Sequence, residues 1–326
     1  MLWCAEIIFK LLLKDFKYFS LITTVIMLKS RFQSAGFKID NINLYFKTSE
    51  TTCNKINSIE KKIYIPKNVP KQIKPINNED FGYYLAGLID GDGHFSNQKQ
   101  LVIVFHNLDV SLAYYIKKRL GYGSVKKIKN KNAVIFVISS KKGLEVIFKL
   151  IRGKLRHINK IIQVNKILKN DNFKEIRKNL DFTNNNNNNK NLNNYWLSGF
   201  ADADASFQIK IINRLNRIKP EIILNLQIDQ KNKDILILIK NYLGGNIGYR
   251  SSQDTYYYGS TSFGSAKKII HYFDKYTLLS SKFIIYLKWR KAYLLIQHRD
   301  HLTELGINKI KKLKLSINKI GKDAII

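Results

Sequence analysis

The stretch YYLAGLIDGDGHF at residues 83–95 places two aspartates, Asp90 and Asp92, at the end of an apolar run with helical spacing. A second stretch, YWLSGFADADASF at residues 195–207, matches it without a gap. Its acids, Asp202 and Asp204, stand at the corresponding positions. Because an internal repeat dictates the architecture of a whole chain, the two stretches indicate two related halves.

The similarity between the halves continues beyond these stretches. Matching residues are 112 positions apart at the acids and 123 apart farther along, where Gly121 corresponds to Gly244. The difference of 11 residues (123 − 112) places one insertion in the second half, near residues 213–221. It is expected to lengthen a hairpin loop.

Each half shows the same order of hydrophobic periodicities, namely helix, strand, strand, helix, strand, strand, helix. The sequence therefore predicts an α+β fold of two αββαββα units with antiparallel sheets. In the first half the elements are expected at about 80–90, 93–97, 100–106, 112–120, 123–127, 133–139 and 142–151. In the second half they are expected, after the motif helix, at 221–228, 233–243, 246–250, 255–263 and 264–273.

Composition divides the chain into five parts. Residues 1–79 match neither repeat and are expected to form a poorly ordered or separately packed leader. The Asn run at 184–189 cannot form a core, so it marks a linker. We expect a first domain at 80–160, the Asn-rich linker at 161–194, a second domain at 195–315 and a basic tail at 316–326.

The balance of charges is strongly basic. Lys and Arg number 56 against 24 Asp and Glu, a formal net charge of +32 in 326 residues, so the favoured partner is a polyanion, above all nucleic acid. The longest early uncharged run, 18–28, is too short for a membrane span, and no membrane partner is expected. The only cysteines, Cys4 and Cys53, exclude a disulfide framework or a zinc site built from cysteine.

The position of Asp92 requires a positive partner. In a continued helix it lies four residues after Leu88 and three after Ile89, at the foot of the apolar stripe. The C-terminal end of a helix already carries partial negative charge, and burial disfavours an ionised carboxylate. Asp204 has the same placement in the second half. A Lys or Arg side chain would offset the charge, but Mg²⁺ fits better, because one or two carboxylates plus substrate phosphates typically hold it.

Small residues would allow the two motif helices to approach closely. Ala86 and Gly87 in the first half correspond to Ser198 and Gly199 in the second. Such an approach would bring both carboxylates to the centre of a basic protein. That arrangement indicates metal-assisted cleavage of phosphodiesters.

The two stretches also resemble the signature of a known family. LAGLIDGDG at 85–93 and LSGFADADA at 197–205 are similar to the two signature copies of the LAGLIDADG homing endonucleases, in the monomeric form that organellar introns encode. The first copy departs from the name motif only at Gly91, and the resemblance covers about 80–315. It implies two pseudo-symmetric domains whose motif helices pack together and whose saddle-shaped sheets lie along the DNA major groove.

The resemblance implies roles for individual residues. Asp92 and Asp204 would hold a divalent metal, Mg²⁺ or Mn²⁺, with the carbonyls of Gly91 and Ala203 as lesser ligands. Asp90 and Asp202 would cap or position the helix ends. The remaining catalytic candidates are Asn107 and Gln230, which would order water, and Lys154 and Lys282, which would polarise the cleavage site.

Two departures from the family's pattern predict unequal sites. Ala205 replaces the final glycine of the motif, so the second half must make its turn without a positive φ. Asn107 in the first half corresponds to Gln230 in the second. Neither departure removes a carboxylate, so the sequence gives no sign of an inactive enzyme.

Alternate residues of a strand face one side, so a sheet in the major groove presents every second side chain to base edges. Polar side chains in or beside the expected strands are therefore the candidates for DNA contact. They are Ser96, Gln98, Gln100, Lys126 and Lys127 in the first half, and Gln208, Lys210, Arg214, Arg217, Asn225, Gln227, Arg250 and Gln253 in the second.

The leading hypothesis is a site-specific double-strand DNA endonuclease that promotes the spread of its host group I intron. It would act as a monomer with an internal pseudo-dimer. The alternative is a maturase that binds the host intron RNA and assists splicing, because the charge suits RNA equally well. The Asn, Lys, Ile and Tyr content indicates AT-rich coding, which together with the family points to a fungal mitochondrial genome.

Overall fold

The computed structural model describes residues 64–169, 173–174, 191–215 and 217–323. The expectations for the uncharged run at 18–28, the Asn run at 184–189 and most of the leader lie outside the described residues. Within the described ranges, no helix combines the length and the apolar character that crossing a bilayer requires.

The two halves contain the expected elements in the expected order, and the predicted α+β fold is confirmed. The first half comprises α3 (Asn78–Gly91), β1 (Gly93–Phe95), β2 (Leu101–His106), η1 (Asn107–Asp109), α4 (Val110–Leu120), β3 (Ser124–Lys127), β4 (Ala133–Ile138), α5 (Lys141–Ile151) and α6 (Ile158–Leu168). The second comprises α8 (Trp196–Asp204), β5 (Ala205–Ile212), β6 (Glu221–Gln230), α9 (Lys233–Leu243), β7 (Asn246–Arg250), η4 (Ser251–Gln253), β8 (Thr255–Ser260), α10 (Phe263–Lys275), α11 (Lys282–Gln297), η5 (Asp300–Leu302) and α12 (Glu304–Asp323).

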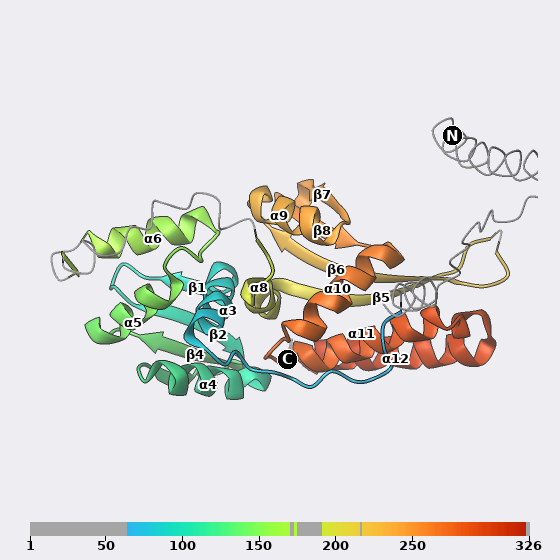
Figure 1. Ribbon diagram of the computed structural model, residues 1–326, viewed down its shortest axis with the longest axis horizontal. Coiled ribbons are helices and arrows are strands. Elements are labelled where there is room, and N and C mark those ends of the chain that lie inside the picture. The colour runs from blue at the N-terminus through green and yellow to red at the C-terminus, as the bar shows by residue number, and fades with distance from the viewer. Residues whose placement is uncertain (1–63, 170–172, 175–190, 216, 324–326) are drawn as a thin grey trace, which may run out of the picture. The chain divides into compact units, whose positions relative to one another are not determined.

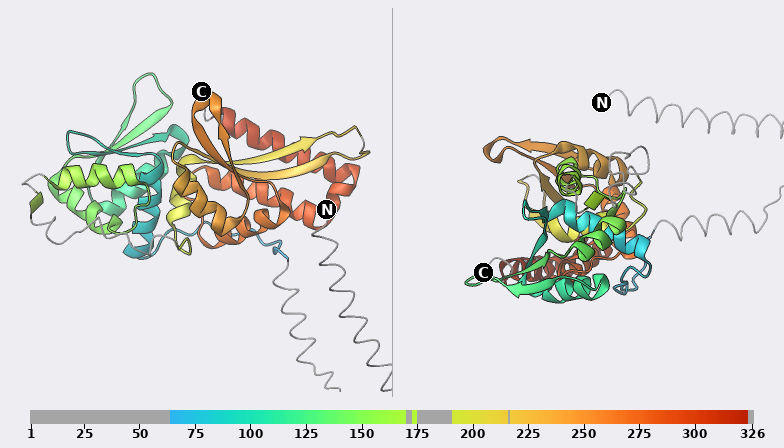
Figure 2. Two further views of the ribbon diagram at one scale, coloured as in Figure 1. Left: turned by 90° about the horizontal axis from the view of Figure 1, so that it is seen from above. Right: turned by 90° about the vertical axis from the view of Figure 1, so that its left-hand side faces the viewer.

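Each half contains one four-stranded antiparallel sheet. The strand orders are β1-β2-β4-β3 and β5-β6-β8-β7, so the two sheets have the same topology. The insertion in the second half lengthens the strands of the hairpin as well as its loop, because β5 and β6 have 8 and 10 residues where β1 and β2 have 3 and 6. Figure 2 shows the longer hairpin in yellow.

The two motif helices, α3 and α8, lie side by side between the sheets (Figure 1). Gly87 and Gly199 make the close approach possible, as predicted. A Cβ at Gly87 would lie 1.9 Å from the carbonyl oxygen of Trp196, and a Cβ at Gly199 would lie 2.0 Å from that of Tyr84. Backbone therefore packs on backbone at this crossing, and a side chain larger than hydrogen has no room at either position.

Two of the predicted boundaries are wrong. Residues 161–168, assigned to the linker, belong to helix α6, whose Ile161, Val164 and Ile167 are buried. The boundary at 315 falls inside α12, so the first residues of the expected tail continue that helix.

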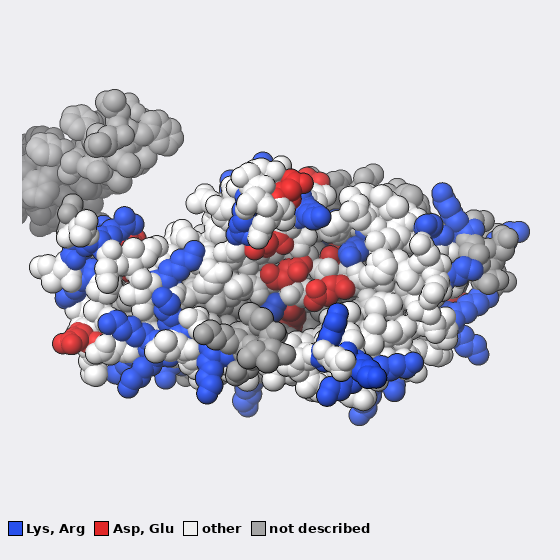
Figure 3. All heavy atoms as spheres, turned by 180° about the vertical axis from the view of Figure 1, so that it is seen from behind, with Lys and Arg blue, Asp and Glu red and all other residues white. Residues whose placement is uncertain are grey.

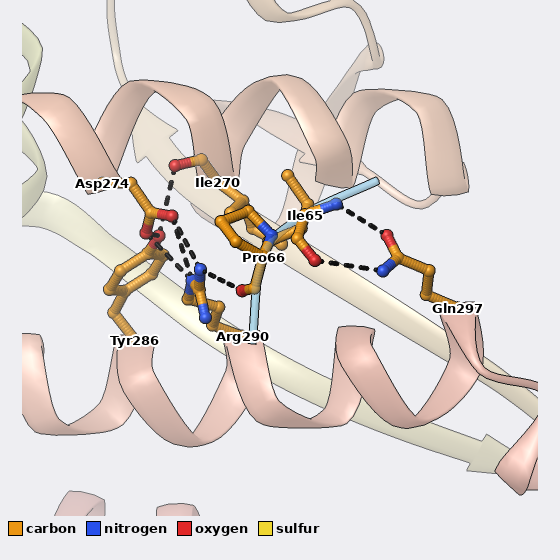
Figure 4. Close-up of polar contacts among 7 residues, drawn as sticks. All are labelled: Ile65, Pro66, Ile270, Asp274, Tyr286, Arg290 and Gln297. Atoms are coloured by element: carbon orange, nitrogen blue, oxygen red, sulfur yellow. Dashed lines mark hydrogen bonds and ion pairs between the residues drawn. The ribbon is translucent and has the colours of Figure 1, made fainter. Parts of the chain in front are cut away.

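The segment from Tyr64 to Asn77, expected to be part of the leader, packs against the second half. Figure 4 shows its start between α10 and α11. Arg290 donates to the carbonyl oxygen of Pro66 at 2.9 Å, and Gln297 both donates to and accepts from the backbone of Ile65. We refer to residues 64–77 as the strap.

Candidate active site

Asp92 and Asp204 end the two motif helices, and β1 and β5 begin at the residue that follows each of them. The residue Asp92 is exposed and Asp204 is half-buried, but other protein atoms lie close to both carboxyl groups. Burial raises the pKa of both carboxyl groups, to about 6 for Asp204, where the nearby charge of Asp92 raises it further. The two carboxylates therefore repel each other, and a cation beside them would relieve that repulsion.

Two lysines lie beside the carboxylates. Lys282 opens α11 and donates from Nζ to the carbonyl oxygens of Ala203 at 2.6 Å and Ala201 at 3.3 Å. Lys160 of α6 donates to the carbonyl oxygen of Gly93. Both ammonium groups act against burial by lowering the pKa of the two acids. Each half thus supplies one cation to the site.

The structure does not bring Lys154 to the carboxylates. Its Nζ lies 3.3 Å from Glu79 Oε2 and 5.2 Å from the ring centre of Tyr83, near the start of α3. Asp92 is 13 residues beyond Glu79, about 20 Å along the helix at 1.5 Å per residue. Lys160, which the sequence reasoning missed, takes the position expected for Lys154.

Gln230 lies at the site, but its counterpart in the first half, Asn107, makes no equivalent contact among the described residues. Gln230 ends β6 and donates from Nε2 to Asp204 Oδ2 at 2.7 Å. Asn107 is exposed in η1, and within the described ranges its side chain makes no hydrogen bond to Asp92. The acids of the two halves are therefore held differently.

Asp90 is buried and joins three parts of the molecule. Its carboxylate accepts hydrogen bonds from the backbone N–H groups of Arg156 at 2.8 Å and His157 at 3.2 Å, immediately before α6. It also accepts from Trp196 Nε1 of α8 at 2.8 Å. Burial raises its pKa to about 6. Asp90 is thus a positioning group for α6, the helix that carries Lys160.

Asp202 repeats this arrangement in the second half. It accepts from the N–H groups of Leu279 at 2.8 Å and Ser280 at 3.3 Å, just before α11, and from the hydroxyl of Tyr84 at 2.8 Å. Burial raises its pKa to about 6. Tyr84 and Trp196 correspond at the offset of 112 (196 − 84 = 112), so the halves exchange equivalent aromatic donors.

The residues present fit a hard divalent cation. Within the described ranges, no group of three or more His, Cys, Asp and Glu side chains is placed to hold a metal. The protein would supply the two carboxylates, with water and DNA phosphates completing the shell, as is usual for Mg²⁺. Of the two carbonyls proposed as lesser ligands, that of Ala203 bonds Lys282, and Gly91 packs on Ala203 and the Asp204 carboxylate. A Cβ at Gly91 would lie 2.3 Å from that of Ala203, which explains the glycine in the first motif.

The replacement of glycine by Ala205 does not make the turns of the two halves differ in the sign of φ. Ala205 adopts φ −83°, and Gly93 is not among the glycines with positive φ. Gly93 is required for space instead, because a Cβ there would lie 2.6 Å from the Cα of Ile89. The second half thus makes its turn without a positive φ, as predicted, and the first half does so too.

The candidate DNA contacts of the second half lie on or beside one open sheet face. Gln208 and Asn225 are cross-strand partners, and Gln208 also donates to Gln227 at 3.2 Å. Arg214 pairs with Glu221, and Arg250 lies 3.7 Å from Asp229. Lys210 is exposed on β5, and Arg217 and Gln253 are exposed near the hairpin loop and in η4.

The candidates of the first half lie at the edges of their sheet. Ser96, Gln98 and Gln100 occupy the β1–β2 connection, and Lys126 and Lys127 are exposed on β3. The middle of the open face instead carries aliphatic side chains, which are not among the predicted DNA contacts. Figure 3 shows one face of the molecule, where acidic side chains gather in the middle and Lys and Arg lie to both sides.

Comparison with known proteins agrees with this architecture. The family described as LAGLIDADG endonuclease matches at residues 85–171 and 197–293. The crystal structure of meganuclease I-SmaMI bound to uncleaveable DNA has the same fold, with a TM-score of 0.57 and 24% identity over 72% of this chain and 97% of that one.

Two relatives are similar over most of the chain. A 37.2 kDa cox1 intron-2 protein of Schizosaccharomyces pombe is 58% identical over 88% of this chain and 85% of its own. The intron-encoded DNA endonuclease aI3 of Saccharomyces cerevisiae is 30% identical over 72% of this chain and 69% of its own. This chain belongs to the LAGLIDADG endonuclease family, with one copy of the motif in each half.

Proposed function

We propose that this protein is a site-specific DNA endonuclease encoded in a group I intron of a fungal mitochondrial genome. It cuts both strands of double-stranded target DNA and thereby promotes mobility of the intron. The observation that carries the proposal is the convergence of Asp92 and Asp204, each with a lysine nearby, where two open sheet faces begin. The similarity to a cox1 intron protein and to an intron-encoded endonuclease supports the genetic setting.

Each site residue has a defined task in this proposal. A bound divalent metal, Mg²⁺ or Mn²⁺, would supply an activated water and stabilise the oxygens of the cleaved phosphate. Asp92 and Asp204 would hold that ion, and Gln230 keeps Asp204 in place through its hydrogen bond. Lys160 and Lys282 provide positive charge toward the phosphates, where negative charge develops during cleavage.

The proposal is tested by cleavage of a plasmid that carries the intron-free junction of the host gene. Reactions with Mg²⁺ and with EDTA are compared at a stated salt concentration, because binding of DNA depends strongly on salt. Specific, Mg²⁺-dependent cutting is expected. A protein that binds the junction tightly and leaves it intact in Mg²⁺ and in Mn²⁺ would contradict the proposal.

Conservative variants test whether the two motif aspartates are required for cleavage. Asp92→Asn and Asp204→Asn each preserve the shape of the side chain and remove its charge, so each is expected to abolish double-strand cleavage while binding persists. Asp234→Asn makes the same change at an exposed acid of α9, away from the open sheet face, and serves as the matched control. Undiminished cutting by either motif variant would refute the assignment.

A second candidate function, binding of the host intron RNA as a maturase, is favoured by one surface feature. A hollow of about 270 Å³ between α9 and α10 is lined by tyrosine rings, among them Tyr242 and Tyr276, and by Lys268, His271 and Lys275. Aromatic rings stack on unpaired bases, and lysines bind phosphates. Both helices pack on β6 from its buried side, so the hollow is separate from the open sheet face.

Separate surfaces make the second function testable alongside the first. Lys268→Gln with Lys275→Gln is expected to weaken binding of the intron RNA and to leave cleavage of the DNA junction unchanged. Lys126→Gln with Lys127→Gln, on the edge strand of the first sheet, is the matched pair. If target DNA displaces the RNA completely, one surface serves both polymers and this assignment of the hollow is wrong.

A further inference from the structure

The open faces of the two sheets begin at the carboxylates but differ in chemistry. β1 starts directly after Asp92, and β5 starts directly after Asp204. Corresponding residues of β2 and β6 are 123 positions apart, as Ile103 and Leu226 show on the buried faces. Each sheet therefore continues from its half of the site, and matched positions on the two faces can be compared.

At two matched positions on the open faces, aliphatic side chains of the first half replace amides of the second. Val102 corresponds to Asn225 (225 − 102 = 123), and Val104 corresponds to Gln227 (227 − 104 = 123). The duplicated fold has therefore kept its topology while the chemistry of this surface diverged.

The first face carries a continuous aliphatic stripe. Val102 is paired across the strands with Val137, and Val104 with Ile135, so these four side chains lie on the same side. The opposite side of the strands holds the buried Leu101, Ile103 and Phe105, so the stripe is not the core. Val104 is 45% exposed. We refer to Val102, Val104, Ile135 and Val137 as the aliphatic stripe.

A basic side chain borders the stripe. Lys126 of β3 lies opposite Ile135 on the same face and is exposed, whereas Lys127, opposite the buried Val134, points to the other face. An ammonium group beside an apolar strip matches DNA, in which phosphates flank the base edges of the major groove.

The second face offers amide groups in place of the stripe. Asn225 donates to Gln208 Oε1 at 3.1 Å, and Gln208 donates to Gln227 Oε1 at 3.2 Å. Asn225 is only 3% exposed and lies beneath this chain of amides, whereas Gln227 is partly exposed and donates in turn to Asp229 at 3.0 Å. These bonds hold the Gln227 amide in a fixed place, which suits pairing with the edge of a base.

We infer that the two halves recognise different features of DNA: the aliphatic stripe contacts the 5-methyl groups of thymines in one half-site, and Gln227 pairs with adenine in the other. This inference rests on the proposed function. Only thymine presents a methyl group in the major groove, and only adenine presents the N6 donor beside the N7 acceptor that an amide can bind bidentately.

The test replaces single chemical groups of the target DNA. Binding of the full protein is measured on the intron-free duplex, on duplexes with uracil for thymine in one half-site at a time, and on duplexes with 7-deazaadenine for adenine in one half-site at a time. Uracil lacks only the methyl group. Loss of one buried methyl is worth about 0.8 kcal/mol, so each contacted thymine is expected to contribute roughly a fourfold loss of affinity.

Matched variants assign each half-site to its sheet. Val102→Ala with Val104→Ala should remove the sensitivity to uracil in one half-site and leave the sensitivity to 7-deazaadenine in the other. Gln227→Ala should do the reverse. Val104 is half exposed, so its replacement should leave the fold intact, which a thermal melt verifies.

Three results would overturn the inference. Uracil could leave affinity unchanged in both half-sites while the unmodified duplex is bound and cut specifically, which would leave the proposed function standing. The uracil effect could also persist undiminished in the double valine variant. Finally, a protein that neither binds nor cuts the unmodified duplex would refute the proposed function and this inference with it.

Discussion

At the scale of single residues, the carboxylates of the candidate site destabilise the protein that holds them. The pKa of Asp204 is raised to about 6, mainly by burial, from an ordinary value of 3.8. A carboxyl group with a raised pKa in the folded state binds its proton more tightly when folded, so stability falls as pH rises from about 3.8 to 6. The full cost, at most about 3 kcal/mol, applies above that window.

Asp204→Asn is therefore expected to stabilise the free protein. In EDTA at pH 8 its melting temperature should exceed that of the unaltered protein by several degrees, because about 1 kcal/mol corresponds to roughly 2–4 °C in a domain of this size. The difference should shrink toward pH 4.5. Asp229→Asn, at an exposed acid, should give no such gain. Equal melting temperatures for Asp204→Asn and the unaltered protein at pH 8 would show that the site is not strained by its charges.

The lysines supply a second prediction at this scale. Lys160→Met removes an ammonium group beside the carboxylates and is expected to slow cleavage by about a hundredfold, a typical loss for one electrostatic group at a reaction centre. Lys154→Met should cut DNA at nearly the original rate, because Lys154 pairs with Glu79 far from the site. Time courses on supercoiled plasmid measure both variants. If Lys154→Met loses activity and Lys160→Met keeps it, the assignment is reversed.

The offset between the halves contained the signal that identifies Lys160. An offset of 123 places Lys282 opposite Asn159, one residue from Lys160, and places Lys154 opposite Thr277. The acids were predictable because their motif is contiguous, and Gln230 because it ends a clear strand. Lys160 was not predictable, because its placement depends on the position of α6. That position depends in turn on the N–H groups of Arg156 and His157, which donate to Asp90 just before the helix.

At the scale of elements, the exchange of aromatic donors between α3 and α8 is expected to stabilise the crossing. Tyr84→Phe deletes only the hydroxyl that donates to Asp202 at 2.8 Å. Hydrogen bonds to charged groups contribute about 1.5–3 kcal/mol, so the variant should unfold at lower denaturant concentration. The bond favours the ionised carboxylate, whose pKa is about 6, so the loss should be larger at pH 8 than at pH 5.

Tyr83→Phe provides the control for this crossing. It makes the same chemical change one residue earlier on α3, where the ring lies beneath Lys154. Urea titrations at the two pH values compare the variants. A Tyr84→Phe protein that is as stable as Tyr83→Phe at pH 8 would exclude a stabilising exchange.

Periodicity predicted the elements of both halves well, since helices and strands with one buried face repeat their apolar residues at fixed spacing. Helix α6 was missed although Ile161, Val164, Ile167 and Leu168 follow helical spacing and are buried. Between these residues lie Gln163, Asn165 and Lys166 as well as the exposed Ile162, and the Asn-rich run nearby made the whole stretch resemble a linker. The prediction therefore followed the composition of this stretch and not its helical spacing.

At the scale of the whole molecule, the strap connects parts that the sequence keeps far apart. Arg290 is buried, pairs with Asp274 at 2.9 Å and donates to Pro66, which lies 224 residues earlier (Figure 4). Toward the other end of the strap, Arg119 of the first half donates to the carbonyl oxygen of Ile76 at 2.7 Å. No pattern within residues 64–77 identifies these partners, because they are carbonyl contacts that any residue type can make. The strap thus links the second half to the first along a route separate from the connection between the domains.

Thr277 offers a clean test of the strap. Its buried hydroxyl accepts from the N–H of Ile73 at 2.9 Å and donates to the carbonyl oxygen of the same residue at 2.7 Å. Thr277→Val keeps the shape and removes both bonds. About 1–2 kcal/mol should be lost, since Ile73 is partly exposed and water can replace some of the interaction.

The expected consequence is a melting temperature lower by roughly 3–6 °C and faster tryptic cleavage at Lys67 and Lys71, which are exposed on the strap. Thr255→Val is the matched control, because the hydroxyl of Thr255 is buried and has no hydrogen-bond partner among the described residues. Its removal should be neutral or stabilising, since a buried polar group without a partner is unfavourable. If both variants melt alike and the strap lysines are cut at the original rate, the strap lies on the second half without stabilising it. A lower melting temperature and faster cleavage in Thr277→Val alone would show that residues before the first motif are part of the folded enzyme.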